Sequence, residues 1–176
     1  NPAEQVEILT AASKKYNDAR IWNNLGVAQT QVGDKAEALK SFEKAAKLDS
    51  SKELNKNLLL ANLANGKTAE AKKYAAAADA ESKAAMAAAE GDYKAAAKGL
   101  KGYNEAIALV QANDLAGAKK AIAKDNSAEA DYLRAVIAAK EGDLKTAEAQ
   151  LKSAVSKNPE LAQKAAKDVN LKALNK

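Results

Sequence analysis

One short pattern recurs five times along the chain and restricts its fold more than any other feature. A helix-breaking residue is followed by polar residues and, five positions after the breaker, by an alanine; the copies are VGDKAEA (32–38), NGKTAEA (65–71), EGDYKAA (90–96), ANDLAGA (112–118) and EGDLKTA (141–147). Glycine ends a helix at low cost because it adopts positive φ angles, and a following Asp can cap the next helix. Each copy therefore predicts the turn of a helical hairpin.

The first copy shows what each position is expected to do. Apolar residues have helical spacing on both sides of it, over 21–32 and over 38–48. We expect Gly33 to adopt the left-handed conformation and Asp34 to cap the second helix, with Glu37 completing a pair that resembles a capping box. Ala38 then marks the place where the second helix presses against the first, since a larger side chain would push the two axes apart.

Composition points to helices with a thin core. Hydrophobic residues make up 47% of the 176 residues, but many of them are alanines, and aromatic residues make up only 4%. Alanine is the best helix former and buries little surface, and no run of alternating β-branched residues predicts a strand. The breaker-to-breaker spacings are 33, 25, 22 and 29 residues, and self-similarity on this scale indicates a helical solenoid.

The residues around the first turn resemble the tetratricopeptide repeat, whose pattern is W-x2-L-G, then A-x3-F, then A, in about 34 residues. The matching residues are Trp22, Leu25, Gly26, Ala38, Phe42 and Ala45. The last copy is similar at Ala147, Leu151, Ala154 and Pro159, whereas the middle copies keep only the second-helix pattern. By this resemblance Trp22 is a core residue and not a ligand-stacking one.

The resemblance and the turns together predict an all-α, right-handed solenoid of about five antiparallel hairpins in a single domain over 1–176. The expected hairpins are approximately 19–50, 52–78, 80–101, 102–124 and 127–157, with 3–16 as the remnant of a preceding repeat. The alanine-rich stretch 75–90 is either a linker or a turn with a short helix, and Asp79 and Gly91 favour the helix. A capping helix is expected over 159–174, with Leu161, Ala165 and Val169 in one apolar stripe.

A tetratricopeptide fold implies a concave groove, lined by the first helices of the hairpins, that binds an extended or helical segment of a protein partner. The positions that the resemblance assigns to the groove are Asn23, Val27, Thr30, Lys56, Asn57, Leu60, Tyr103, Ile107, Gln111 and Tyr132. The alternative is that the asparagines are simply exposed and that Tyr103 and Tyr132 fill gaps between alanine-rich helices. The carboxylate clamp known in the family is not evident, because the chain has no arginine besides Arg20 and Arg134.

Several classes of function lack the residues they need. The chain contains no Cys and no His, so thiol catalysis and the commonest general base and metal ligand are missing. We therefore expect no enzyme activity, no cofactor and no metal. The formal charge is +5, but the lysines are dispersed among acidic residues, which does not favour nucleic acid. No segment reads as a membrane span or a signal peptide.

The expected function is a protein-interaction scaffold, active as a monomer, that binds a partner peptide or helix. The alternative is a structural spacer, without a dedicated ligand, inside a larger multidomain envelope protein. Degenerate, alanine-rich repeats resemble those of larger bacterial envelope proteins, which favours an extracytoplasmic location slightly over a cytoplasmic one. Because the sequence begins at Asn1 and not at Met, we expect it to be processed or excised from a longer chain.

Overall fold

The computed structural model of the chain describes residues 1–174, and within that range its regular elements are helices, with no β-strand. Within each of two compact units, helices that follow one another in the sequence pack together, which confirms the predicted all-α, tetratricopeptide-like solenoid class. By their internal contacts the helices divide into two compact units that meet in the sequence between Asp92 and Tyr93. In each unit the helices pack around buried residues that belong to that unit alone.

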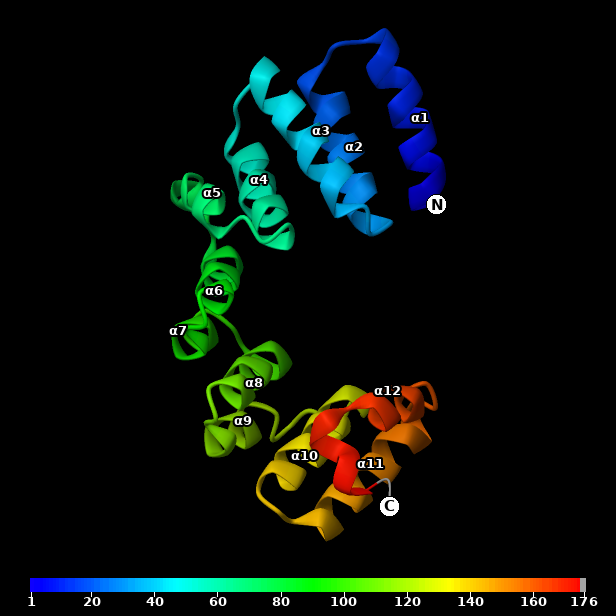
Figure 1. Cartoon of the computed structure of the whole chain (residues 1–176), viewed down its shortest axis with the longest axis vertical. Coiled ribbons are helices and arrows are strands. Elements are labelled where there is room, and N and C mark those ends of the chain that lie inside the picture. The colour runs from blue at the N-terminus through cyan, green and yellow to red at the C-terminus, as the bar shows by residue number, and fades with distance from the viewer. Residues whose placement is uncertain (175–176) are drawn as a thin grey trace. The chain divides into compact units, whose positions relative to one another are not determined.

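The first unit contains six α-helices and one short 3₁₀ helix within the described residues (Figure 1). They are α1 (Pro2–Lys15), α2 (Ala19–Gln31), α3 (Lys35–Leu48), α4 (Lys52–Ala64), α5 (Thr68–Lys72), η1 (Ala75–Ala77) and α6 (Ala80–Ala89). The helix α1 covers the stretch predicted as the remnant of a preceding repeat. The stretch 75–90, predicted as a turn and a short helix, forms η1 and α6, and Asp79 caps α6 by accepting the Ser82 N–H at 2.9 Å.

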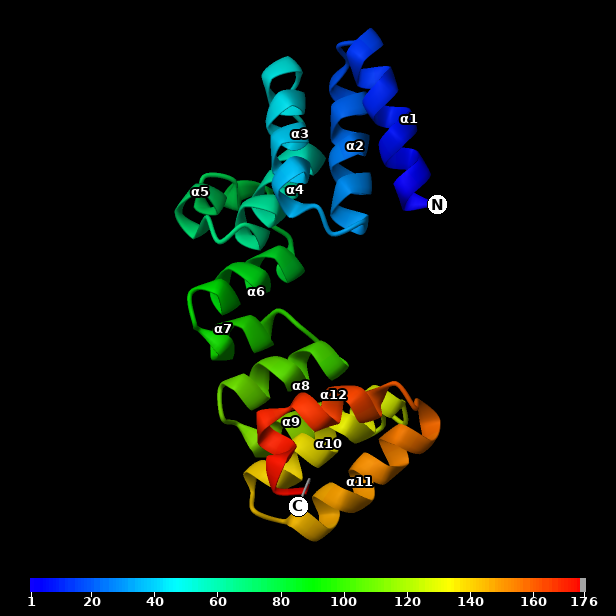
Figure 2. The same ribbon diagram turned by 45° about the vertical axis from the view of Figure 1, so that its right-hand side comes forward.

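The second unit also contains six α-helices and one 3₁₀ helix within the described residues. They are α7 (Tyr93–Lys98), α8 (Gly102–Gln111), α9 (Leu115–Ala121), α10 (Ala128–Lys140), α11 (Leu144–Lys157), α12 (Leu161–Lys167) and η2 (Val169–Leu174). The pair α10 and α11 makes the longest hairpin of this unit, and the terminal elements α12 and η2 pack on it (Figure 2).

The predicted helix breakers sit in the left-handed region of backbone space. Gly33 has φ +86° and Asn113, which takes the place of glycine in the fourth copy, has φ +59°. The Asp34 N–H donates to the Gln29 carbonyl oxygen at 2.9 Å, and the Asp34 carboxylate accepts the Glu37 N–H at 3.3 Å. The predicted return bond from Glu37 is absent because the Asp34 N–H is already bonded; the Glu37 carboxylate pairs with Lys40 instead.

The alanines that follow the breakers are the tightest helix contacts. Each of the five is at most 1% exposed: Ala38, Ala71, Ala96, Ala118 and Ala147. A methyl group at this position lets the two helices of a hairpin approach closely. The prediction that this alanine marks the contact between paired helices therefore agrees with the structure at Ala38, Ala71, Ala118 and Ala147, where both helices lie in one unit, and stays a prediction at Ala96.

The core of the first unit lies between α2, α3 and α4. Leu39, Phe42, Leu54 and Leu58 are its large buried side chains, and Trp22 packs against this cluster, as expected of a core residue. The Lys44 ammonium lies 4.2 Å from the centre of the Trp22 ring. Gly26 on α2 faces Phe42 so closely that a Cβ at Gly26 would lie 2.6 Å from the Phe42 ring.

Each range predicted as a hairpin contains successive helices. In one of these ranges the two helices belong to different units. The range 80–101 contains α6 and α7, and the division between the two units falls inside it. The short helix α7 packs on α8, within the second unit. The single-domain boundaries and the five hairpin ranges therefore stay predictions.

The predicted capping helix differs in its second half. Leu161 and Ala165 are buried as expected, but Val169 is 68% exposed and Leu171 is fully buried in its place. The helix ends because Asp168 adopts an extended conformation and its carboxylate accepts the Asn170 N–H at 2.9 Å. The 3₁₀ turn that follows changes the spacing from four residues to three, so the predicted stripe was wrong at Val169.

Candidate functional site

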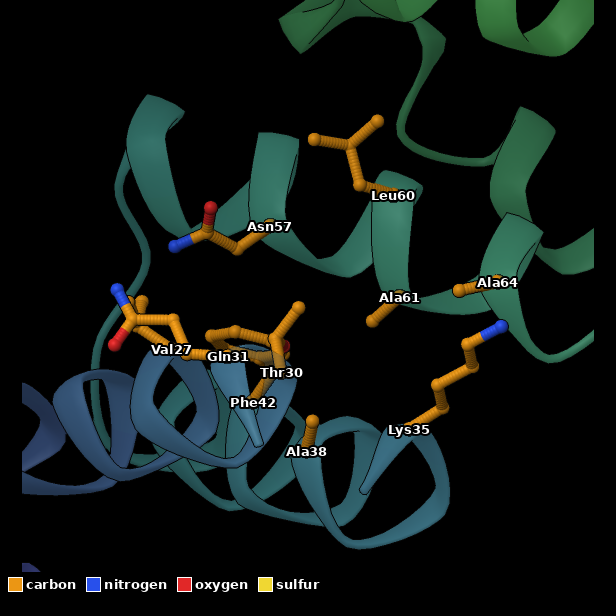
Figure 3. A pocket seen from close by; sticks show the side chains of 10 residues that line it. All are labelled: Val27, Thr30, Gln31, Lys35, Ala38, Phe42, Asn57, Leu60, Ala61 and Ala64. Carbon is orange, nitrogen blue, oxygen red and sulfur yellow. The ribbon is translucent and has the colours of Figure 1, made fainter. Parts of the chain in front are cut away.

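A hollow of about 340 Å³ opens in the first unit between α2, α3 and α4 (Figure 3). Three of its lining residues come from α2, three from α3 and four from α4. The lining residues are Val27, Thr30, Gln31, Lys35, Ala38, Phe42, Asn57, Leu60, Ala61 and Ala64. We call this feature the α2–α4 hollow.

The floor of the α2–α4 hollow is apolar and belongs to the core. Phe42 and Ala38 rise from α3, and Ala61 points toward them from α4 (Figure 3). The close approach of Gly26 to the Phe42 ring fixes the position of that ring. A buried aromatic side chain therefore provides a rigid base on which a partner group can rest.

Four of the sequence-predicted groove residues line this hollow: Val27, Thr30, Asn57 and Leu60. Val27 is 37% exposed and Leu60 is 38% exposed, which is unusual for large aliphatic side chains beside a core. The Thr30 hydroxyl donates to the Gly26 carbonyl oxygen at 2.8 Å, so its oxygen can still accept a bond. The helical register predicted from Gly33 thus brings these residues together.

Two further predicted residues, Asn23 and Lys56, do not line the hollow and are engaged in contacts within the unit. The Asn57 side-chain amide donates to the Asn23 side-chain oxygen at 2.9 Å and so joins α4 to α2. Lys56 forms an ion pair with Asp79, the cap of α6. This pairing and the Ser82 N–H bond hold the pKa of Asp79 well below its usual range. Lys56 therefore links α4 to α6 and is not a free cation.

A second, shallower hollow of about 470 Å³ lies between α1 and α2. Its lining includes Ile8 and Gln5 from α1, and it shares Val27 and Gln31 with the α2–α4 hollow. Ile8 is 67% exposed. Exposed aliphatic side chains of α1, α2 and α4 thus border two hollows that meet at Val27.

The predicted residues of α8 line neither the α2–α4 hollow nor the hollow between α1 and α2. Tyr103 is half-buried against the core of the second unit, and burial, followed by the charges of Glu129 and Asp125, raises the pKa of its hydroxyl. Ile107 is 38% exposed and Gln111 is exposed. Tyr103 thus packs on the core of the second unit, and its groove role stays a prediction.

Tyr132 is a core residue of the second unit, 3% exposed. Its hydroxyl donates to the Asp168 carboxylate at 2.8 Å, and the Lys164 ammonium lies 4.8 Å from the ring centre. Burial, together with the neighbouring Asp168 carboxylate, raises the pKa of the Tyr132 hydroxyl. The elements α12 and η2 therefore cover the side of α10 on which Tyr132 lies.

A polar cluster that the sequence reasoning missed joins α10 to α11. The Asp131 carboxylate is bonded by Arg134 at 2.8 Å, by Lys157 at 2.6 Å and by the Ser153 hydroxyl at 2.6 Å. Burial favours a higher pKa for Asp131, but these hydrogen bonds outweigh it and the pKa is lowered. Only the spacing of three residues between Asp131 and Arg134 hinted at this cluster in the sequence.

Sequence reasoning also missed part of the α2–α4 hollow. Gln31 and Ala64 each follow a predicted lining residue by four positions, Val27 and Leu60 respectively, so helical spacing could have identified them. Lys35 had no such signal, because it begins the second helix of its hairpin and only the fold turns it toward the hollow.

Residues 1–174 contain neither a cluster suited to hold a metal ion nor a helix suited to cross a membrane. No group of three or more potential metal-ligating side chains lies together there. None of the helices in that range has the length and apolar character that a bilayer crossing requires.

Part of the chain matches a known protein family. Residues 19–52, which contain α2 and α3, match the family described as Tetratricopeptide repeat. This range covers one hairpin of the chain and includes Val27, Thr30 and Phe42 of the α2–α4 hollow. No curated protein matches the chain.

Proposed function

We propose that this chain, which is a protein of the tetratricopeptide-repeat type, acts as a protein-interaction scaffold that holds a peptide or helix of a partner in the α2–α4 hollow. Tetratricopeptide repeats are in general protein–protein interaction modules built on a non-catalytic scaffold. The finer part of the proposal concerns the place of binding and its chemistry.

The observation that carries the proposal is a contrast in side-chain exposure between the first helices of hairpins in the first unit, α2 and α4, and the first helix α10 in the second unit. In the first unit, Val27 and Leu60 are each more than a third exposed beside an apolar floor. In the second unit, Tyr132 of α10 is buried under α12 and η2. An exposed apolar hollow with a polar rim is typical of a binding surface. The residues of α2 and α4 are therefore the best placed to contact a partner.

The groove proposal predicts which substitutions weaken binding. The full chain is probed with a phage-displayed library of random peptides, and captured peptides are then titrated by fluorescence anisotropy. Leu60→Asp places a charge on the apolar rim and should weaken binding at least about tenfold, since truncating one interface anchor commonly has this effect. Leu144→Asp is the matched control, because Leu144 on α11 is also exposed, at 43%, and lies outside the hollow.

Equal loss of affinity in both variants, or none in Leu60→Asp, would contradict binding in the hollow. Circular dichroism and the melting temperature of each variant show whether the fold is retained. The proposed monomeric state is checked on the same samples by sedimentation equilibrium.

A second candidate function, a structural spacer within a longer envelope protein, has one observation in its favour. The terminal elements α12 and η2 cover α10, as expected of a unit that stabilises itself and offers little to a ligand. The spacer proposal predicts that no library peptide is captured and that Leu60→Asp changes nothing but surface charge. A captured peptide that depends on Leu60 would contradict it.

A further inference from the structure

We infer that the α2–α4 hollow selects an acidic peptide: one large apolar side chain of the partner enters the hollow, and a neighbouring Asp or Glu of the partner pairs with Lys35. This inference rests on the proposed function, because it names the class of partner for the same site. It adds a chemical preference that binding in the hollow does not by itself require.

The first argument is size and polarity. The hollow holds about 340 Å³ and has Phe42, Ala38 and Ala61 at its floor. An apolar cavity of roughly 150 Å³ is enough to hold a benzene molecule. The α2–α4 hollow can therefore accept a side chain as large as that of Phe, or a Leu with room for the neighbouring main chain. Burying such a side chain also covers the exposed parts of Val27 and Leu60.

The second argument is the charge of the lining. The lining residues include one lysine and no Asp or Glu. The Lys35 side chain reaches across the edge of the hollow toward Ala64 (Figure 3). A peptide that fills the hollow therefore meets a positive charge at the rim and no negative lining residue to offset it. A carboxylate on the peptide is the complementary group.

The third argument is that Lys35 has no carboxylate partner among the described residues. Several other cations of the first unit are engaged, such as Arg20 with Asp18 at 2.8 Å, Lys40 with Glu37, and Lys56 with Asp79. The Lys35 side chain is exposed, and it is the main chain of Lys35 that is bonded: its oxygen accepts from the Asn65 side-chain amide at 2.9 Å and its N–H donates to the Gly33 carbonyl oxygen at 3.0 Å. Its ammonium therefore remains available to a ligand beside the apolar floor.

The rim also offers bonds to a peptide main chain. Gln31 carries an amide with both a donor and an acceptor, and Asn57 keeps its side-chain oxygen after donating to Asn23. These groups are neutral and suit the main chain of any sequence. They supply affinity without selecting among side chains, so the selection falls to the apolar floor and to Lys35.

The inference is tested with an array of nine-residue peptides, acetylated at the N-terminus and amidated at the C-terminus. Each peptide has Phe, Leu or Ser at its centre and a single Asp, Lys or Ser two, three or four positions away, in a Gly/Ser background. Spacings of two positions in an extended chain and of three or four in a helix place both side chains on one face. Binding of the full chain is measured by fluorescence anisotropy.

We expect peptides with a central Phe or Leu and a nearby Asp to bind at least tenfold more tightly than the same peptides with Lys. Lys35→Glu should reverse this preference. Lys47→Glu is the matched control, because Lys47 lies on the same helix, is exposed and does not line the hollow. Ala64→Trp should abolish binding, since Ala64 is an exposed rim residue whose replacement fills the hollow.

The outcomes separate the inference from the proposed function. If Ala64→Trp abolishes binding while Lys35→Glu leaves the Asp preference unchanged, the acidic-peptide inference is overturned and the hollow remains the binding site. If Ala64→Trp leaves binding intact, the hollow is not the site and the proposed function fails as well. A second set of the same peptides, with a free C-terminal carboxylate in place of the amide, is measured in parallel. Binding that requires this terminal carboxylate, and no side-chain Asp, also overturns the inference.

Discussion

The hydroxyl of Tyr132 donates a hydrogen bond to the carboxylate of Asp168 over 2.8 Å, and this bond joins α10 to the segment that covers it. The Asp168 carboxylate also accepts the Asn170 N–H at 2.9 Å, so one side chain both ends α12 and contacts Tyr132. Leu161 and Leu171 pack into the same core from either side of Asp168. A tyrosine expected in a groove is thus part of the closure of the second unit.

We predict that Tyr132→Phe lowers the free energy of unfolding by about 1 kcal/mol, the net value of one hydrogen bond. The ring and its packing are kept, so the effect isolates the hydroxyl. Urea denaturation followed by circular dichroism measures the change. Tyr103→Phe is the control, because Tyr103 also packs on the core of this unit and no bond of its hydroxyl is seen; its stability should change by less than about half as much.

The Asp131 cluster should contribute more than the Tyr132 bond. Its carboxylate is 8% exposed and bonded by Arg134, Lys157 and Ser153, and Arg134 also donates to the carbonyl oxygens of Ile122 and Asp125. We predict that Asp131→Asn lowers the free energy of unfolding by about 2 kcal/mol, because hydrogen bonds to charged groups are the stronger ones. Asp143→Asn should be nearly neutral, since Asn caps a helix as well as Asp does. Equal effects of the two variants would contradict this ranking.

The Asp131 contribution should also depend on pH in a defined direction. The pKa of Asp131 is lowered in the folded chain, so its stabilising effect is complete above the unfolded pKa of about 3.9 and disappears as pH falls through the folded value. The stability difference between the wild type and Asp131→Asn should be constant from about pH 5 to 7 and shrink below about pH 4. Urea midpoints of both proteins across this range provide the measurement. A difference that grows on acidification would show that the sign is wrong.

The sequence predicted the turns well because they depend on local backbone geometry. Gly33 and Asn113 have positive φ, and Ala38 and Ala118 are buried five residues later. These features repeat along the chain and need no knowledge of distant contacts. The same local register brought Val27 and Leu60 to one hollow, since both positions are fixed by their distance from a turn.

Features that depend on one residue meeting another far along the chain were not predictable in this way. Tyr132 and Asp168 are 36 positions apart, and Val169 was misplaced because Asp168 ends the helix before it. The exposed Lys35 of a second helix reaches the hollow only because α3 packs between α2 and α4. A periodic pattern reports which residues share a helix face and does not report what covers that face.

The turn geometry itself can be tested at Gly33. A Cβ there would meet nothing within 4 Å, so the cost of Gly33→Val comes from the backbone alone. With φ at +86° we expect a loss of about 1–2 kcal/mol, because a β-branched residue resists positive φ. Asn113→Gly is the control and should be neutral or mildly stabilising, since its φ of +59° already suits both residues. An unchanged melting temperature for Gly33→Val would contradict the proposed role of this turn.

Local stability should vary along the chain with helix length. The helices α6, α7, α8 and α9, which lie within residues 75–125, have 10, 6, 10 and 7 residues, whereas α2 and α3 have 13 and 14. Short helices bury fewer methylene groups, each worth roughly 0.8 kcal/mol. We expect native-state hydrogen exchange to show lower protection over residues 75–125 than over 19–50. Uniform protection across both ranges would show that the alanine contacts compensate for the missing length.

The close approach of Gly26 to Phe42 predicts that substitutions at these two positions have non-additive effects on the free energy of unfolding. Glycine inside a helix costs about 0.5–1 kcal/mol relative to alanine, so Gly26→Ala would stabilise an unobstructed helix. Here the new methyl group would lie 2.6 Å from Cε1 and 2.9 Å from Cζ of Phe42, a ring that is 3% exposed. Overpacking of this kind costs about 1–3 kcal/mol, and Gly26→Ala should therefore destabilise the wild type.

Phe42→Leu removes Cε1 and Cζ, and it replaces ring Cδ1, which would lie 2.8 Å from the new methyl group, by a methyl group that can rotate away. Adding Gly26→Ala to that background should therefore cost less than it does in the wild type, or stabilise. Urea denaturation of the four proteins gives the coupling free energy, which we expect to exceed about 0.5 kcal/mol. Because Phe42 is also the floor of the α2–α4 hollow, the displaced ring of Gly26→Ala should reduce peptide binding as well. Additive effects of the two substitutions would show that the ring moves aside freely, and that Gly26 is not what positions the floor of the hollow.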